Sequence, residues 1–281
     1  MIGYHPESLI AELSEIARLI RIDVIEMITR AGSGHPGGSL SSADILAALF
    51  FHQMKLDPAN PSWPARDRFI LSKGHAAPAL YAALARRGFF PRDELWTLRR
   101  LDSRLQGHPD RNKTPGVEMT AGALGHGIAI GAGLALGLRL NNNPARVYLL
   151  IGDGELQAGV IWEGIMTAAK YCLSRLTVIM DYNDVQLDGP VHAIMPIAPV
   201  IDKWRAFNWH VIELDGHNMR ALLEALDQAG DVHDRPTVLV AHTTKGKGVS
   251  FMEGRHEWHG GALNPEQYAQ AMRELGMEVA P

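Results

Sequence analysis

Four short apolar runs, separated by stretches of helical character, constrain the fold of this chain more than any other feature. The runs cover residues 146–151, 176–180, 209–214 and 237–241, and each ends at glycine or polar residues. A short continuous apolar run is typical of a strand that is buried on both faces. Strands that alternate with helices predict an α/β fold with a mainly parallel sheet and helices on both of its faces.

The helices are predicted from apolar residues at helical spacing. Such spacing occurs in residues 8–30, 42–52, 161–171 and 220–229. No fixed-period repeat, low-complexity tract or long Pro/Gly/Ser linker divides the 281 residues. We therefore expect one domain that spans residues 1–281.

Composition excludes several classes of function. The 27 basic and 31 acidic residues leave a net charge of −4, so the chain lacks the basic excess of a nucleic-acid or anionic-membrane binder. Cys172 is the only cysteine, which excludes an internal disulfide or a thiolate cluster and favours a reducing cytoplasm. The first residues do not resemble a signal peptide, and no apolar run reaches the roughly 20 residues that span a bilayer. Charged residues make up 21% of the chain, below the usual quarter, as expected for large subunit interfaces.

The strand ends carry the unusual residues. In a parallel sheet, ligands bind outside the carboxyl ends of the strands. Gly152-Asp153-Gly154 follows the first run and Asn183 follows the second. A lone Gly-Asp-Gly is more often a tight turn with a solvated aspartate, but a carboxylate and an amide oxygen from adjacent strand ends make a hard-oxygen site for Mg²⁺ or Ca²⁺. With one charged ligand, such a site needs further negative charge, which a diphosphate would supply.

Together with their flanking motifs, these residues identify a family resemblance. Gly152-Asp153-Gly154-Glu155 with Asp181-Tyr182-Asn183 resembles the thiamine diphosphate signature. The chain also resembles transketolase in a set of motifs that occur in the family's order through nearly its whole length: Ser33–Gly38, Ser72–His75, Gly107–Pro109 and His259-Gly260. The resemblance implies the thiamine diphosphate-binding fold, in its diphosphate-binding type of domain.

The resemblance implies a cofactor and a metal for the site. Asp153, Asn183 and the backbone carbonyl of Val185 would bind Mg²⁺, with Ca²⁺ or Mn²⁺ as substitutes. The remaining implied contacts to thiamine diphosphate come from His75, Gly154, Asn183, His259 and the segment Gly122, Ala123 and Leu124. Amide groups at a helix start favour a phosphate, and an imidazole can donate to it.

Histidines occur thirteen times, and most of them need no function. We interpret His5, His192, His210 and His233 as structural. His35, His108 and His259 lie in glycine-containing turns, and the resemblance implies that they surround the reactive thiazolium carbon, bind the sugar's oxygens and assist proton movement. An imidazole suits this role because its ordinary pKa is about 6.5.

Two glycine-rich segments have structural interpretations. Within residues 122–137, we expect a helix in which Gly131, Gly133 and Gly137 let a neighbour pack tightly. Residues 245–248, Lys-Gly-Lys-Gly, lack the spacing of a phosphate loop. We expect a mobile loop that closes over the site, with both lysines solvated.

The resemblance also implies a second polypeptide. In the family, a glutamate from a pyrimidine-binding domain protonates the cofactor across a subunit interface, and this chain ends before that domain would begin. We therefore expect inactivity alone and an α2β2 assembly with a C-terminal transketolase subunit. Ala158 replaces a glutamate of the network that links the two cofactor sites, although Glu163 is retained. His126 stands where glutamine is common.

The expected reaction is transfer of a two-carbon ketol group between sugar phosphates, as in pentose phosphate metabolism. Alternatives are a deoxyxylulose-phosphate synthase-like or 2-oxo-acid dehydrogenase-like subunit, a transketolase for a sulfonated or branched sugar, and a regulatory subunit without catalysis. Gly34–Gly38 together with Trp258-His259-Gly260 favours transketolase.

Overall fold

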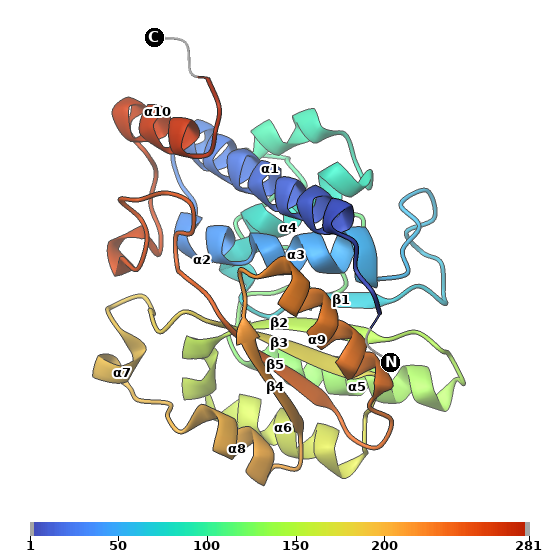
Figure 1. Cartoon of the computed structure of the whole chain (residues 1–281). Helices are drawn as coiled ribbons and strands as arrows, with labels where there is room; N and C mark the ends of the chain where they lie inside the picture. The colour runs from blue at the N-terminus through green and yellow to red at the C-terminus, as the bar shows by residue number, and fades with distance from the viewer. Residues whose placement is uncertain (1–2, 279–281) are drawn as a thin grey trace.

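A five-stranded, entirely parallel sheet forms the centre of the molecule in the computed structural model, which describes residues 3–278 (Figure 1). The strands lie in the order β1-β2-β3-β5-β4. Their bounds are Arg68–Leu71 for β1, Val147–Gly152 for β2, Leu176–Tyr182 for β3, His210–Asp215 for β4 and Thr237–His242 for β5. The four predicted strands are confirmed to within two residues at each end, and β1 was not predicted.

Helices cover both faces of the sheet, as expected (Figure 1). On one side lie α1 (Glu7–Ala31), α2 (Pro36–Ser41), α3 (Ala43–Ala48), α4 (Ala77–Arg87), α9 (Met219–Asp231) and α10 (Pro265–Glu274). On the other lie α5 (His126–Leu140), α6 (Gly159–Lys170) and α8 (Val200–Ala206), with the short α7 (Val191–Ile194) near the carboxyl edge.

Two separate cores follow from the alternation of side chains along each strand. In β2, Tyr148 and Leu150 belong to the core under α1, α3, α4 and α9, whereas Val147, Leu149 and Ile151 belong to the core under α5, α6 and α8. Successive residues of a strand point to opposite faces, so a continuous apolar run fills both cores. This is why these strands appear in the sequence as unbroken apolar runs.

The predicted helix at residues 42–52 differs in detail. Ser42 separates α2 from α3, and a turn of π-helix, Leu49–Gln53, continues α3. The other three predicted helices correspond to α1, α6 and α9. Gly32, at φ +63°, ends α1 in the left-handed conformation that glycine adopts without steric cost.

The tight packing expected at glycines of α5 is found at other positions. A Cβ on Gly131 would make only ordinary contacts, and one on Gly133 or Gly137 would meet no atom within 4 Å. The close approaches are instead at Gly127 in the first turn of α5, where a Cβ would lie 2.4 Å from Ser72 Oγ, and at Gly164 of α6, where a Cβ would lie 2.6 Å from Ile128. The Cβ positions of Gly133 and Gly137 are therefore not covered by the described part of this chain, whereas Gly131 is buried against the sheet.

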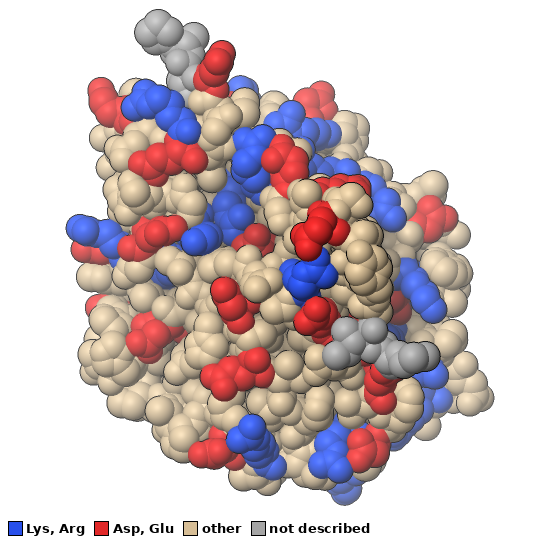
Figure 2. All heavy atoms as spheres, in the orientation of Figure 1, with Lys and Arg blue, Asp and Glu red and all other residues tan. Residues whose placement is uncertain are grey.

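Surface charge is mixed. On the face shown in Figure 2, Lys and Arg side chains are interspersed with Asp and Glu. None of the helices described within residues 3–278 has both the length and the apolar character needed to span a membrane.

Candidate active site

The predicted site residues gather at the carboxyl edge of the sheet. A cavity of about 340 Å³ lies there, lined by residues that follow β1, β2, β3 and β5. It includes seven of the predicted cofactor and metal residues: His75, Leu124, Asp153, Gly154, Asn183, Val185 and His259. Gly122 and Ala123, the other predicted cofactor contacts, are exposed and do not line this cavity.

Asp153 follows β2 directly and is buried, with 3% of its surface exposed. Its Oδ1 accepts the backbone N–H of Gly154 at 2.7 Å, and its Oδ2 accepts those of Asn183 at 3.0 Å and Asp184 at 2.5 Å. Burial and the nearby carboxylate of Asp181 raise the pKa of Asp153 to about 7. The carboxyl group is thus fixed in place but short of positive charge, as expected of a cation ligand.

Asn183 and Val185 complete the donor set. Asn183 Nδ2 donates to Asp181 Oδ2 at 3.2 Å, which fixes the orientation of the amide, and Asn183 Oδ1 accepts from Val185 N at 3.1 Å. A carboxylate, an amide oxygen and a backbone carbonyl are hard oxygen donors that suit Mg²⁺. Within residues 3–278 no three His, Cys, Asp or Glu side chains form a metal site by themselves. The donor set therefore fits a metal that also binds an anionic ligand.

A buried ion pair lies beneath the cavity. Asp181, at the end of β3, is fully buried and accepts from Lys73 Nζ, from Ser41 Oγ at 2.7 Å and from Thr243 Oγ1. Lys73 also donates to Gly38 O at 2.9 Å. Sequence motifs contain Lys73 and Asp181 but indicate no role for them. In the structure they join the ends of β1, β3 and β5 to α2.

Glu155 fixes the turn after β2. Its Oε1 accepts from Ser72 Oγ at 2.6 Å and Gly125 N at 2.8 Å, and its Oε2 accepts from Gly152 N at 2.8 Å. The carboxylate is 2% exposed. It therefore connects the turn that carries Asp153 to the start of α5.

Four turn histidines meet beside this edge. The ring centroids of His35 lie 5.3 Å from His75, 6.4 Å from His108 and 5.8 Å from His259, and the rings of His75 and His259 stack at 4.8 Å. The residues come from four separate loops, so only the fold brings them together.

All four imidazoles have lowered pKa values. Burial, together with the charges of Arg99 and Lys245, lowers the pKa of His35 to about 4. Burial and Lys245 lower the pKa of His259 to about 3. Burial likewise lowers the pKa of His75 and His108. At neutral pH these rings are uncharged and each offers one hydrogen-bond donor and one acceptor.

The prediction for Lys245 is wrong. The sequence predicts a solvated lysine in a mobile loop, but Lys245 is 3% exposed and lines the cavity. Its Nζ donates to Val185 O and to His259 Nδ1, each at 2.8 Å. Burial lowers the pKa of Lys245 to about 8. A carbonyl oxygen has two lone pairs, so Val185 O retains one for a metal. Lys247, by contrast, is partly exposed, as expected.

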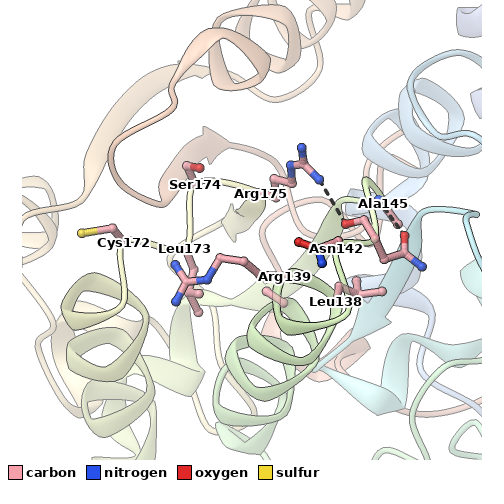
Figure 3. A pocket seen from close by; sticks show the side chains of 10 residues that line it. Leu138, Arg139, Asn142, Ala145, Cys172, Leu173, Ser174 and Arg175 are labelled. Carbon is pink, nitrogen blue, oxygen red and sulfur yellow. Dashed lines mark hydrogen bonds between the residues drawn. The ribbon is translucent and has the colours of Figure 1, made fainter.

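A second cavity, of about 310 Å³, lies at the opposite, amino edge of the sheet (Figure 3). Ten residues line it, among them Arg139 at the end of α5 and Arg175 before β3. Arg175 donates to Asn143 O at 3.0 Å, and Arg139 donates to Tyr171 O. The two guanidinium groups thus hold the backbone, and none of the ten residues is a predicted site residue.

Comparison with known proteins defines the class. The family described as "Transketolase, thiamine diphosphate binding domain" matches residues 13–281. The fold is thus that of a thiamine diphosphate-binding domain. The chain belongs to the transketolase family, whose members are transferases.

Some relatives match this chain over nearly their whole length, and others match it over less than half of theirs. The chain is 45% identical to the 6-deoxy-6-sulfo-D-fructose transketolase subunit of Clostridium sp. (strain MSTE9), over 96% of this chain and 98% of that one. It is 39% identical to the apulose-4-phosphate transketolase subunit of Phocaeicola vulgatus, over 91% of each. The transketolase structure from Campylobacter jejuni superposes with a TM-score of 0.90 at 33% identity, covering 96% of this chain and 43% of that one.

Proposed function

We propose that this chain is the diphosphate-binding subunit of a two-chain transketolase, which transfers a two-carbon ketol group from a ketose phosphate to an aldose phosphate. The observation that carries the proposal is the meeting of Asp153, Asn183, Val185 and the four turn histidines at one edge of a transketolase-family sheet. Relatives named as subunits match this chain over nearly their whole length. We also propose that residues 1–281 form one domain and that the protein is located in the cytoplasm.

The residues at the carboxyl edge divide the work of binding. Asp153, Asn183 and the carbonyl of Val185 hold Mg²⁺, and Gly154, His75 and His259 contact the diphosphate, with Lys245 and Lys73 as nearby positive charge. Leu124 gives apolar contact, and the exposed Gly122 and Ala123 precede it and permit close approach of the cofactor. When bound, thiamine diphosphate supplies the nucleophilic carbon and the electron sink for carbon–carbon cleavage.

The histidines act on the substrate. His35, His108 and His259 are neutral at pH 7, so they bind the sugar's hydroxyl and carbonyl oxygens by hydrogen bonds and pass protons between them. The ring centroid of His35 lies 5.3 Å from that of His75, which lines the cavity, and 6.4 Å from that of the exposed His108.

The partner subunit is supported by the surface of α5 and α6. Large apolar side chains are exposed there at Ile130, Leu140 and Met166, and Leu124 is exposed just before α5. Gly133 and Gly137 lie on the same helix, and Arg139 is the one charged residue of α5. A group of exposed large apolar side chains of this kind is typical of a permanent subunit interface. We propose that the partner supplies the catalytic glutamate, in an α2β2 assembly.

The departures from the family pattern lie near this surface. Ala158 is partly buried beside Gly125, and Glu163 is exposed on α6. His126 is exposed at the first turn of α5, with Nδ1 3.3 Å from Leu124 O. We propose that communication between the two cofactor sites is weakened or rerouted.

Reconstitution with the C-terminal subunit tests the proposal. The pair is assayed with xylulose 5-phosphate and ribose 5-phosphate, and separately with pyruvate and glyceraldehyde 3-phosphate. We expect activity only with a ketose donor, only with both chains present, and with dependence on thiamine diphosphate and Mg²⁺. Full activity of the purified chain alone, or activity only with pyruvate, would contradict it.

A modified sugar is the second candidate substrate, and the 45% identity to a sulfofructose transketolase subunit favours it. The same reconstituted pair is assayed with 6-deoxy-6-sulfofructose, apulose 4-phosphate and fructose 6-phosphate as donors. A preference of more than about tenfold in kcat/KM for one of the first two, equivalent to about 1.4 kcal/mol, would assign the chain to that substrate.

A further inference from the structure

Two loops meet at the back of the active site: the loop after β4 lies outside the cavity, and the loop after β5 carries Lys245, which lines it. The loop after β4, Asp215-Gly216-His217-Asn218, packs against residues 243–246 after β5. Gly216 N donates to His242 O at 2.7 Å, and a Cβ on Gly216 would lie 2.6 Å from Thr243 Cγ2. A side chain at position 216 would therefore push the two loops apart.

His217 connects this contact to the helices above it. Its Nε2 accepts the backbone N–H of Thr244 at 2.8 Å, and its Nδ1 lies 2.7 Å from Asp44 Oδ2. A backbone N–H can only donate, so Nε2 is the acceptor and Nδ1 carries the proton. Both ring nitrogens are thus used, and the tautomer follows from the partners.

Asp44 holds that tautomer. It lies in α3, and its carboxylate pairs with Arg21 of α1. Burial alone would raise the pKa of Asp44, but the hydrogen bond from His217 and the charge of Arg21 lower it below the ordinary value. The side chain of His217 is 14% exposed, so little water competes for these contacts.

Lys245 follows Thr244 directly. Thr243 Oγ1 donates to Asp181, and Gly246 N donates to Gly37 O at 3.0 Å. Between these two hydrogen bonds, the bond from Thr244 N to His217 Nε2 holds the backbone of the loop in place. Lys245 Nζ in turn donates to His259 Nδ1 at 2.8 Å, which leaves Nε2 as the N–H of His259.

We propose that His217 is a positioning residue for the active site: by accepting the Thr244 N–H it holds Lys245 on His259, and so sets the tautomer of His259. The role of His259 toward cofactor and sugar rests on the proposed function, but the geometry of the chain from Arg21 to His259 does not. A residue outside the cavity thereby decides which His259 nitrogen is the donor.

Two substitutions separate the acceptor from the rest of the ring. In His217→Gln, Oε1 reaches about as far as Nε2 and can still accept from Thr244 N. In His217→Asn, the amide reaches only as far as Nδ1, so contact with Asp44 remains and contact with Thr244 is lost. Both replacements are neutral and polar, which makes them a matched pair.

Imidazole ¹⁵N spectra of the full chain give the direct readout, with the His259 signals assigned from His259→Gln. We expect the Nε2–H tautomer of His259 in the wild-type chain and in His217→Gln, and a mixture of tautomers in His217→Asn. Hydrogen exchange at residues 244–247 should speed up about tenfold in His217→Asn only. The Kd for thiamine diphosphate with Mg²⁺ should rise about tenfold in the same variant, as for other groups that act through a ligand.

Neither the spectra nor the exchange rates require transketolase activity, so a failed reconstitution leaves this test intact. An unchanged His259 tautomer in His217→Asn would overturn the proposal, and so would equal losses in both variants. Should His217→Asn not fold, Asp44→Asn tests the same step, because an amide can donate to Nδ1 and thereby move the His217 proton to Nε2. A His259 tautomer unaffected by that change would also count against the proposal.

Discussion

The carboxyl edge of the sheet and the outer surface of α5 and α6 differ in whether this chain itself supplies contacts for their side chains. At the carboxyl edge, buried Asp181 pairs with Lys73, and Glu155 accepts three hydrogen bonds. On α5 and α6, by contrast, Ile130 and Met166 are 45% and 54% exposed. The chain therefore builds the polar part of the site by itself, whereas it leaves large apolar side chains of α5 and α6 exposed.

Breaking the buried ion pair should have the largest effect. Lys73→Met leaves the carboxylate of Asp181 buried without its cation, which typically costs about 3–5 kcal/mol. Urea denaturation of the chain measures the free energy of unfolding. Arg205→Met, which breaks the exposed pair with Asp202, is the control and should cost less than about 1 kcal/mol. Similar losses of unfolding free energy in the two variants would mean that the buried pair at the carboxyl edge stabilises the chain no more than an exposed ion pair does.

Removal of the proposed metal ligand comes next. Asp153→Ala should raise the Kd for thiamine diphosphate with Mg²⁺ at least about hundredfold in the two-chain enzyme, because even groups behind a ligand contribute about 10–100-fold. Isothermal titration calorimetry measures the Kd, and Asp202→Ala on α8 is the control. Retained Mg²⁺-dependent binding would defeat the metal assignment.

On the surface of α5 and α6, we expect a substitution to weaken assembly with the partner and to leave the stability of the chain nearly unchanged. Ile130→Asp changes an exposed residue, so the free energy of unfolding of the chain should stay within about 0.5 kcal/mol. Affinity for the partner should fall by roughly 2 kcal/mol, about thirtyfold, as when a charge enters an apolar interface. Sedimentation velocity of the mixed chains measures the affinity. Tyr4→Asp is the control, because Tyr4 is 89% exposed and lies outside this surface, and it should leave assembly unchanged. An equal loss of affinity in Tyr4→Asp would contradict a partner interface on α5.

Low pH should lower the stability of the folded chain through the histidines at the carboxyl edge of the sheet. His35 and His259 have pKa values of about 4 and about 3 when folded, against an ordinary 6.5. From about pH 6.5 downward the unfolded chain binds protons that the folded chain does not, so stability is complete above pH 6.5 and falls toward pH 4. After allowance for solvent screening, we expect a loss on the order of 2 kcal/mol.

Urea midpoints between pH 7.5 and 4.5 measure this loss. The double variant His35→Gln, His259→Gln should show a flatter dependence, because two of the responsible groups are gone. A wild-type profile as flat as that of the double variant would show that these imidazoles do not contribute.

The smallest effect concerns Ala158. Since Ala158 and Glu163 lie beside the α5 and α6 surface, Ala158→Glu should restore coupling between the two cofactor sites by roughly 1 kcal/mol, within the usual range for coupled sites. Cofactor titration of the assembled enzyme gives the Hill coefficient. An unchanged coefficient would count against a network at this interface.

Much of the fold was predictable because burial on both faces leaves a strong pattern. β2, β3, β4 and β5 follow from their apolar runs, and the ends of β2 and β3 located Asp153 and Asn183. β1 was missed because it has four residues and begins with Arg68, too short a run to stand out. Lys245 was misplaced because a lysine between glycines in a loop is usually solvated.

The sequence by itself determined the alternation of strands and helices, the polar strand ends, and the family motifs, because these depend on neighbouring residues along the chain. Tertiary structure alone decided that Lys73 pairs with Asp181, that Lys245 lies on His259, and that His217 reaches Thr244. The first and third of these contacts join the ends of different strands, and the second joins two residues 14 positions apart in the segment after β5, so sequence separation carries no information about these distances. The exposed face of α5 is likewise a tertiary result, since its residues are apolar enough for a core and only the packed chain shows which side is left uncovered.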